Sequence, residues 1–197
     1  MLDLPPRTWE RVLVELPKID LKDQCALMSD YPDDHPIWEH PENDPILFSA
    51  MKKLALAKSK LALKALNGVI DDPSVFFSSH VDSAKFVADS GRVYCGEVSM
   101  DQRRALVEGF QNGDFPRLSC TIAAAGLGLT LTRARTAVFV NRTFSHAQNS
   151  QAEDRVYRIG QTNPVRIIDI ESDSPLDARL KKILKRKKSI QDSLFAG

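Results

Sequence analysis

The spacing of apolar positions changes near residue 68. Between residues 45 and 66, in PILFSAMKKLALAKSKLALKAL, apolar residues recur every three or four positions, which predicts one long amphipathic helix. Gly68 follows it, and glycine commonly ends a helix. Beyond this point, short apolar runs alternate with segments of helical periodicity. The pattern therefore predicts a long helix that leads into an alternating α/β unit.

Apolar runs of strand length recur along the chain, and helical segments separate most of them. Regular alternation of strand and helix is typical of a mostly parallel sheet. The predicted strands are RVLVEL (11–16), SVFFSS (74–79), RVYCG (92–96), RLSCTI (117–122), TAVFV (136–140) and VRIIDI (165–170).

Two S-x-x-Q patterns mark helix starts, because a serine and a glutamine three residues later can satisfy free backbone N–H groups. Ser99 and Gln102 predict the start of a helix over 101–113, and Ser145 and Gln148 place QAEDRVYRI on another. A third helix, VDSAKFVADSG, is predicted to end at Gly91, and a basic helix closes the chain.

Charge divides the chain unevenly, although its net charge is only +1. Residues 1–45 hold four basic and eleven acidic residues, and residues 175–197 hold seven basic and two acidic ones. Four prolines lie within 21–45, so we expect an acidic, poorly ordered loop there. We predict a lead-in strand and loop over 1–45 and one lobe over 46–197. The basic end is either a solvated helix face or an edge that meets phosphate or a partner.

Composition excludes several classes of protein. The chain has 197 residues, of which 43% are hydrophobic and 27% charged, which is typical of a globular protein. It has neither an apolar run of membrane-spanning length nor a signal-like N-terminus. Its three cysteines are far apart, which argues against disulfides or zinc and for the cytoplasm, or the nucleus in a eukaryote. His35 and His40 have scattered acidic neighbours, so no metal site is predicted.

Small, polar and basic residues follow the predicted strands. Because ligands of such sheets bind beyond the carboxyl ends of the strands, these residues form the candidate rim. They are SSH (78–80), AAAGLG (123–128) and NRTF (141–144), with His80 and His146 as polar lining. This combination suits a polyanion.

Gln151, Arg155 and Arg158 share one face of the predicted helix, since they are four and three residues apart. Arginine gives phosphate two parallel donors and keeps its charge when partly buried. The alternative is a surface ladder of ion pairs with Glu153 and Asp154.

The chemistry needed to hold ATP is missing. None of the nine glycines precedes a lysine, so no phosphate-binding G-x-x-x-x-G-K-[ST] loop exists, and no Asp-Glu pair is present to hold magnesium. Gly126 and Gly128 fit a phosphate loop weakly, and a tight strand-to-helix turn is the alternative. The chain alone therefore cannot cradle the terminal phosphates of ATP.

The string TIAAAGLGLTLTRARTAVFVNRTFSHAQNSQAEDRVYRIGQTNPV closely resembles motifs V and VI of the Swi/Snf-family DNA translocases, which are superfamily-two helicase-like ATPases. VFFSSHVDSAKFVAD resembles motif IV, and the likeness covers nearly the whole chain. The wording AAAGLGLTLT is nearest the annealing-helicase and phage-type branch. Three departures concern the rim: Ala125 stands where a second glycine is frequent, Asn141 replaces a frequent acidic residue, and FSH (144–146) replaces WNP.

This resemblance implies a RecA-like three-layer lobe with a mostly parallel sheet, the second lobe of a two-lobe motor. ATP with Mg²⁺ would then be held mainly by an N-terminal lobe, in the same parent chain or a separate subunit. The resemblance implies arginine fingers at Arg155 and Arg158, with Gln151 linking nucleotide state to the interlobe contact. It places Gly126, Gly128 and Asp154 at the nucleotide cleft. Contacts to the backbone of double-stranded DNA are implied at Ser78, Ser79, His80, Thr121 and Thr130.

Two further functions remain open. One is a stand-alone module that binds DNA or a partner without hydrolysis, and the other is a nucleotide- or RNA-binding α/β domain. An N-terminal lobe encoded nearby would favour the motor.

Overall fold

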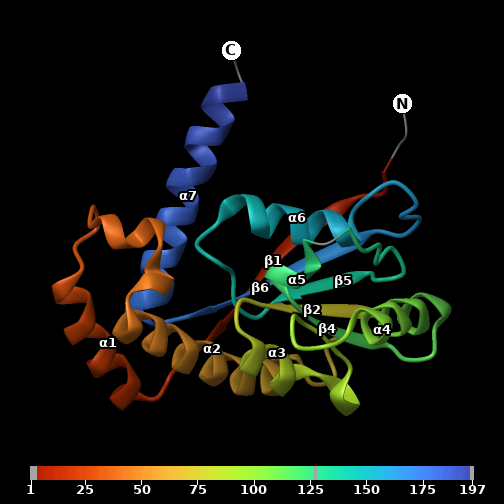
Figure 1. Ribbon diagram of the computed structural model, residues 1–197, viewed down its shortest axis with the longest axis horizontal. Helices are drawn as coiled ribbons and strands as arrows, with labels where there is room; N and C mark the ends of the chain where they lie inside the picture. Colours follow the sequence, from red (N-terminus) through yellow and green to blue (C-terminus); the bar gives the residue numbers. More distant parts are fainter. Residues whose placement is uncertain (1–3, 127, 196–197) are drawn as a thin grey trace.

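The computed structural model describes residues 4–126 and 128–195, and it contains one six-stranded sheet (Figure 1). The strand order is β1-β6-β5-β2-β4-β3, and every neighbouring pair is parallel. The predicted α/β fold is therefore confirmed. The strands are β1 (Arg7–Val14), β2 (Ser74–Ser78), β3 (Val93–Tyr94), β4 (Arg117–Thr121), β5 (Thr136–Phe139) and β6 (Val165–Ser172).

Alternate residues of the central strands fill two different hydrophobic layers, as the period of a strand requires. On one face, Phe77 and Phe139 stack with ring centroids 5.0 Å apart and pack with α4 (Met100–Asn112), α5 (Ile122–Ala125) and α6 (His146–Val156). On the other face, Phe76 and Val138 pack with α2 (Pro45–Leu66) and α3 (Val81–Val87). Helices on both faces of a parallel sheet make the predicted three layers.

Most predicted helix starts are present. Ser99 forms the complete capping box with Gln102, and the Ser145 hydroxyl accepts the backbone N–H of Gln148 at 3.3 Å. Asp44 caps α2 by accepting the N–H of Leu47 at 2.8 Å. Two short 3₁₀ helices, η1 (Pro36–Glu39) and η2 (Pro41–Asn43), precede α2, and a third, η3 (Asp89–Gly91), follows α3. None of the described helices is long and apolar enough to cross a membrane.

The expected loop over 21–45 is wrong, because this segment contains α1 (Lys18–Asp30) followed by η1 and η2. A third hydrophobic cluster orders it. Trp38 stacks on Phe144 with ring centroids 5.7 Å apart and packs with Leu47, Leu176 and Ile183. The segment therefore has its own apolar contacts despite its charge. The proposed domain division at residue 45 stays a prediction.

The last helix, α7 (Pro175–Phe195), begins in this third cluster and then projects away from the sheet (Figure 1). A buried ion pair fixes its first turn, since Lys58 Nζ of α2 lies 2.7 Å from Asp177 Oδ2. Farther along, Arg179 stacks over the Trp38 ring and donates to the Tyr31 carbonyl at 2.9 Å. The lower half of α7 is thus fixed to the body.

Candidate functional site

The predicted site residues lie in two groups. Arg155, Arg158 and Gln151 gather with Gly126 and Thr130 between α5 and α6. The other group lies at the carboxyl ends of β2 and β4 and holds Ser78, Ser79, His80 and Thr121.

The guanidinium of Arg155 is held by the backbone after β4. Its Nε donates to the Ala125 carbonyl at 3.0 Å, and Nη2 donates to the Gly126 carbonyl at 3.1 Å. The Arg155 carbonyl in turn accepts the N–H of Leu131 at 2.8 Å. Segments some thirty residues apart are therefore fixed to each other at this arginine.

Arg158 does not share a helical face with Arg155, which corrects the prediction. The helix α6 ends at Val156, and the buried side chain of Gln161 donates to the Val156 carbonyl at 3.1 Å. Beyond that end, Arg158 Nη1 reaches the Thr130 hydroxyl at 3.2 Å. Thr130 therefore lies with the arginines and not with the strand-end residues.

Gly126 lies against Gln151. A Cβ atom built on Gly126 would lie 3.3 Å from the Ala123 carbonyl oxygen and 3.7 Å from Gln151 Oε1. Gly128 is exposed with a φ of +78°, a conformation that favours glycine. Gly126 is the C-cap of α5, and Leu127 between the two glycines lies outside the described residues. The role of the two glycines at the nucleotide cleft stays a prediction.

The alternative ladder of ion pairs is not formed. Among residues 4–126 and 128–195, neither Arg155 nor Arg158 has a carboxylate oxygen within 4.0 Å. Asp154 is exposed, and Glu153 pairs with Arg142 Nη1 at 2.8 Å and with Arg7 Nη1 at 3.8 Å. The site arginines therefore carry charge that no described carboxylate neutralises.

Arg142 connects α6 to the sheet. In the sequence it belongs to the candidate rim NRTF, with no predicted role of its own. It donates to both carboxylate oxygens of Asp169 on β6, at 2.5 and 3.1 Å, and its charge lies 3.9 Å from the centroid of Phe139. Burial lowers the pKa of Arg142, but the carboxylates of Asp169 and Glu153 outweigh burial and raise it overall. Asp169, an acidic residue within the apolar run VRIIDI, was the sequence feature that could have indicated this ion pair.

Ser78 and Thr121 are partners in the sheet register, but both side chains are buried. The Ser78 hydroxyl accepts from Ser83 Oγ at 3.1 Å, and Ser83 also accepts from Asn141 Nδ2 at 2.8 Å. The Ser78 hydroxyl is therefore engaged in a buried network and does not face solvent, and the predicted DNA contact through hydroxyls and nearby N–H groups stays a prediction. Asn141, one of the departures, serves this network. Ser79 is the more exposed hydroxyl here.

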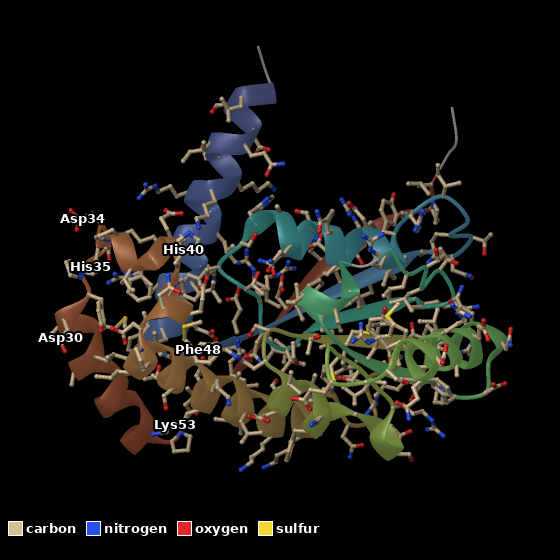
Figure 2. All side chains as sticks on the ribbon, viewed as in Figure 1. Asp30, Asp34, His35, His40, Phe48 and Lys53 are labelled. Atoms are coloured by element: carbon tan, nitrogen blue, oxygen red, sulfur yellow. The ribbon has the colours of Figure 1, made fainter. Side chains whose placement is uncertain are left out.

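His80 is neutral in this setting. Its side chain is 9% exposed, and its ring meets Phe48 edge-on with centroids 5.4 Å apart (Figure 2, where Phe48 is labelled). Burial chiefly lowers the pKa of His80 to about 4, and the charge of Lys52 lowers it further against the opposing effect of Asp82.

We expect His80 to make stability fall with acidity. The folded-state pKa of about 4 lies below the ordinary value of 6.5, so between these values only the unfolded chain takes up the proton. The histidine therefore has little effect on the free energy of unfolding above pH 6.5. It lowers that free energy by about 3 kcal/mol as the pH falls from 6.5 to 4. His80→Gln should flatten the dependence of the unfolding free energy on pH in urea titrations across this range. Parallel curves for the two proteins would contradict this.

The donor set fits a phosphate better than a metal. Two guanidinium groups and the amide of Gln151 offer N–H donors, whereas no metal-binding group of His, Cys, Asp or Glu forms in the described residues. These groups can thus donate hydrogen bonds to the oxygens of an anionic phosphate.

The family model described as the helicase conserved C-terminal domain matches residues 57–160. The chain is 32% identical over 100 residues to the putative ATP-dependent helicase/translocase YwqA of Bacillus subtilis, covering 51% of this chain and 11% of that protein. It is 27% identical over 214 residues to the human DNA annealing helicase and endonuclease ZRANB3, covering 100% of this chain and 20% of that protein. It therefore spans only a small part of these relatives.

Solved structures share the fold. The Sulfolobus solfataricus SWI2/SNF2 ATPase core domain matches with a TM-score of 0.72 at 21% identity, over 98% of this chain and 45% of that chain. The same core in complex with double-stranded DNA matches with a TM-score of 0.67 at 20% identity, over 96% and 46%. The C-terminal part of the Fun30 ATPase domain matches with a TM-score of 0.67 at 15% identity, over 92% and 90%.

Proposed function

Because the chain belongs to the helicase conserved C-terminal domain family, among relatives of the Swi/Snf type, we propose that it is the second motor lobe of an ATP-dependent translocase on double-stranded DNA. One observation carries the proposal. Arg155 and Arg158 lie in one cluster, both without a carboxylate partner among the described residues, on a chain that lacks a phosphate-binding loop of its own.

In the proposed motor, an N-terminal lobe holds ATP with Mg²⁺ and presents the γ-phosphate to this face. Arg155 and Arg158 stabilise the charge that develops on the phosphate during transfer, as arginine fingers do. Gln151, whose side-chain oxygen lies near Gly126, would link the nucleotide state to the contact between the two lobes. Gly128 and Asp154 would line the cleft.

The DNA backbone would meet the strand-end group, through Ser79 and the backbone N–H groups near His80 and Thr121. Such contacts position the duplex without reading its sequence. The SWI2/SNF2 core solved with double-stranded DNA shares this fold, which supports DNA as the polymer. The chain would then act where DNA lies, in the cytoplasm of a prokaryote or the nucleus of a eukaryote.

We expect the chain alone to show no ATPase activity, because it cannot hold the terminal phosphates. Adding an N-terminal lobe that carries a Gly-Lys loop and an Asp-Glu pair should give ATP hydrolysis that rises when duplex DNA is present. Phosphate release measured with each lobe alone, with both, and with or without duplex tests this. Robust turnover by the chain alone would refute a split site, whereas DNA binding with no turnover in any mixture would favour the non-hydrolysing module.

A further inference from the structure

The middle of α7 is more basic than the fold requires. Residues 181–188 read KKILKRKK, with six cations in eight positions. Three of these cations have carboxylate partners: Lys181 with Glu171, Lys182 with Asp33 and Lys187 with Glu39. The other three, Lys185, Arg186 and Lys188, are exposed. No carboxylate oxygen lies within 4.0 Å of them in the described part of the chain.

Local structure gives these three cations no ion-pair partner among the described residues, although the charge of Arg186 adds to the larger effect of Lys187 in lowering the pKa of Glu39. The three cations lie in the middle of α7 and not in its last turn, so the helix dipole does not stabilise their charges. Lys181 and Lys185, and likewise Lys185 and Lys188, are like charges at spacings of four and three, which disfavours the helix. The apolar positions Leu176, Leu180 and Ile183 pack against the body from another side of the helix. A bound polyanion would relieve the repulsion.

The beginning of α7 lies beside the strand-end group, and the three cations follow about one to two turns farther along the same helix. Leu176, Asp177 and Leu180 share the lining of a small pocket with Ser79 and His80. Higher up, Gln191 lies 3.0 Å from Nδ1 of His146, the first residue of α6. The helix thus rises from the carboxyl ends of the strands past the start of α6 (Figure 1).

We propose that Lys185, Arg186 and Lys188 form an accessory track for the phosphate backbone of double-stranded DNA. This inference rests on the proposed function, because it extends the DNA-binding edge by one helix. Double-stranded DNA carries about one charge per 1.7 Å of its axis, so three cations within one helical turn can meet adjacent phosphates. Contacts of this kind are independent of sequence and sensitive to salt.

The test measures the affinity of the full chain for a fluorescent duplex by fluorescence anisotropy, at salt concentrations from about 50 to 200 mM. The variant is Lys185→Gln/Arg186→Gln/Lys188→Gln. Each lost phosphate contact lowers the slope of log affinity against log salt by about 0.9, so the slope should fall by about 2.7. The affinity ratio of wild type to variant should then shrink about 40-fold across this salt range.

A matched control removes the same number of positive charges from a different helix, α2. Lys53, Lys60 and Lys64 are exposed lysines of α2, and Figure 2 shows Lys53 on the side of α2 away from α7. Lys53→Gln/Lys60→Gln/Lys64→Gln should leave the slope within about 0.5 of wild type. Circular dichroism checks that both variants fold.

Three results would overturn the track: an unchanged slope in the α7 variant, an equal loss in the α2 variant, or no duplex binding by the wild-type chain. An unchanged slope combined with a weaker ATPase response to the N-terminal lobe would assign the cations to a protein contact instead. None of these results tests the proposed role of Arg155 and Arg158 in ATP hydrolysis, because hydrolysis in the two-lobe mixture is measured separately.

Discussion

Replacing Arg155 with alanine should lower the DNA-stimulated ATPase rate of the two-lobe mixture by about 10³- to 10⁵-fold, the usual contribution of an arginine finger. Arg158→Ala should lie in the same range. The physical reason is that both guanidinium groups supply charge and directed donors to phosphate oxygens, and no described neighbour replaces them. Turnover under saturating ATP gives the measurement, with kcat falling more than the apparent affinity for ATP.

Two controls separate chemistry from folding. Arg104→Ala removes an exposed arginine of α4 and should leave kcat unchanged. Thermal melting should show that Arg155→Ala still folds, although the carbonyl oxygens of Ala125 and Gly126 lose their donors. Unchanged turnover in both site variants would mean that the arginines only fasten α6 to the backbone after β4.

The second large effect concerns stability. Arg142→Met should lower the free energy of unfolding by about 3–5 kcal/mol, because it leaves the carboxylates of Asp169 and Glu153 partly buried without their main cation. Urea denaturation of the two proteins measures the difference. The double variant Arg142→Met/Asp169→Leu should recover much of the loss, since an apolar replacement of a whole buried pair is often nearly neutral.

Arg179 is the matched control for Arg142. It is equally enclosed and also stacks on an aromatic ring, but its partner Asp33 is 48% exposed and can be solvated. Arg179→Met should therefore cost clearly less than Arg142→Met. A loss under about 1 kcal/mol for Arg142→Met would show that water reaches the carboxylates and that this ion network does not hold α6.

Local patterns were sufficient for most of the fold. Apolar runs such as SVFFSS and the capping sequence at Ser99 act within a few residues, so they predict a strand and a helix start without knowledge of the rest. The acidic segment before residue 45 was misjudged for the opposite reason. Trp38 is ordered by stacking on Phe144, about a hundred residues away in the sequence, and local composition does not indicate such a long-range contact.

The candidate site shows the same limit. Spacing brought Gln151 and Arg155 together correctly, because α6 is regular through both. It failed at Arg158, since α6 ends at Val156. The Gln161 side chain donates to the Val156 carbonyl at 3.1 Å, and the Tyr157 hydroxyl donates to the carbonyl of Pro5, which precedes β1, at 2.9 Å. Ser78 looked like a surface hydroxyl, yet its partner Ser83 and the amide of Asn141 are contributed by other elements.

The short helix α5 has a mechanical consequence. It starts at Ile122, directly after the last residue of β4, Thr121, and ends at Ala125, whose carbonyl oxygen accepts a hydrogen bond from the Arg155 guanidinium. Four helical residues span about 6 Å, so a tilt of this rigid element at the strand end moves both acceptors of the arginine almost equally. In the proposed motor, this single helical turn would connect the strand ends that meet DNA with the arginines that meet the nucleotide.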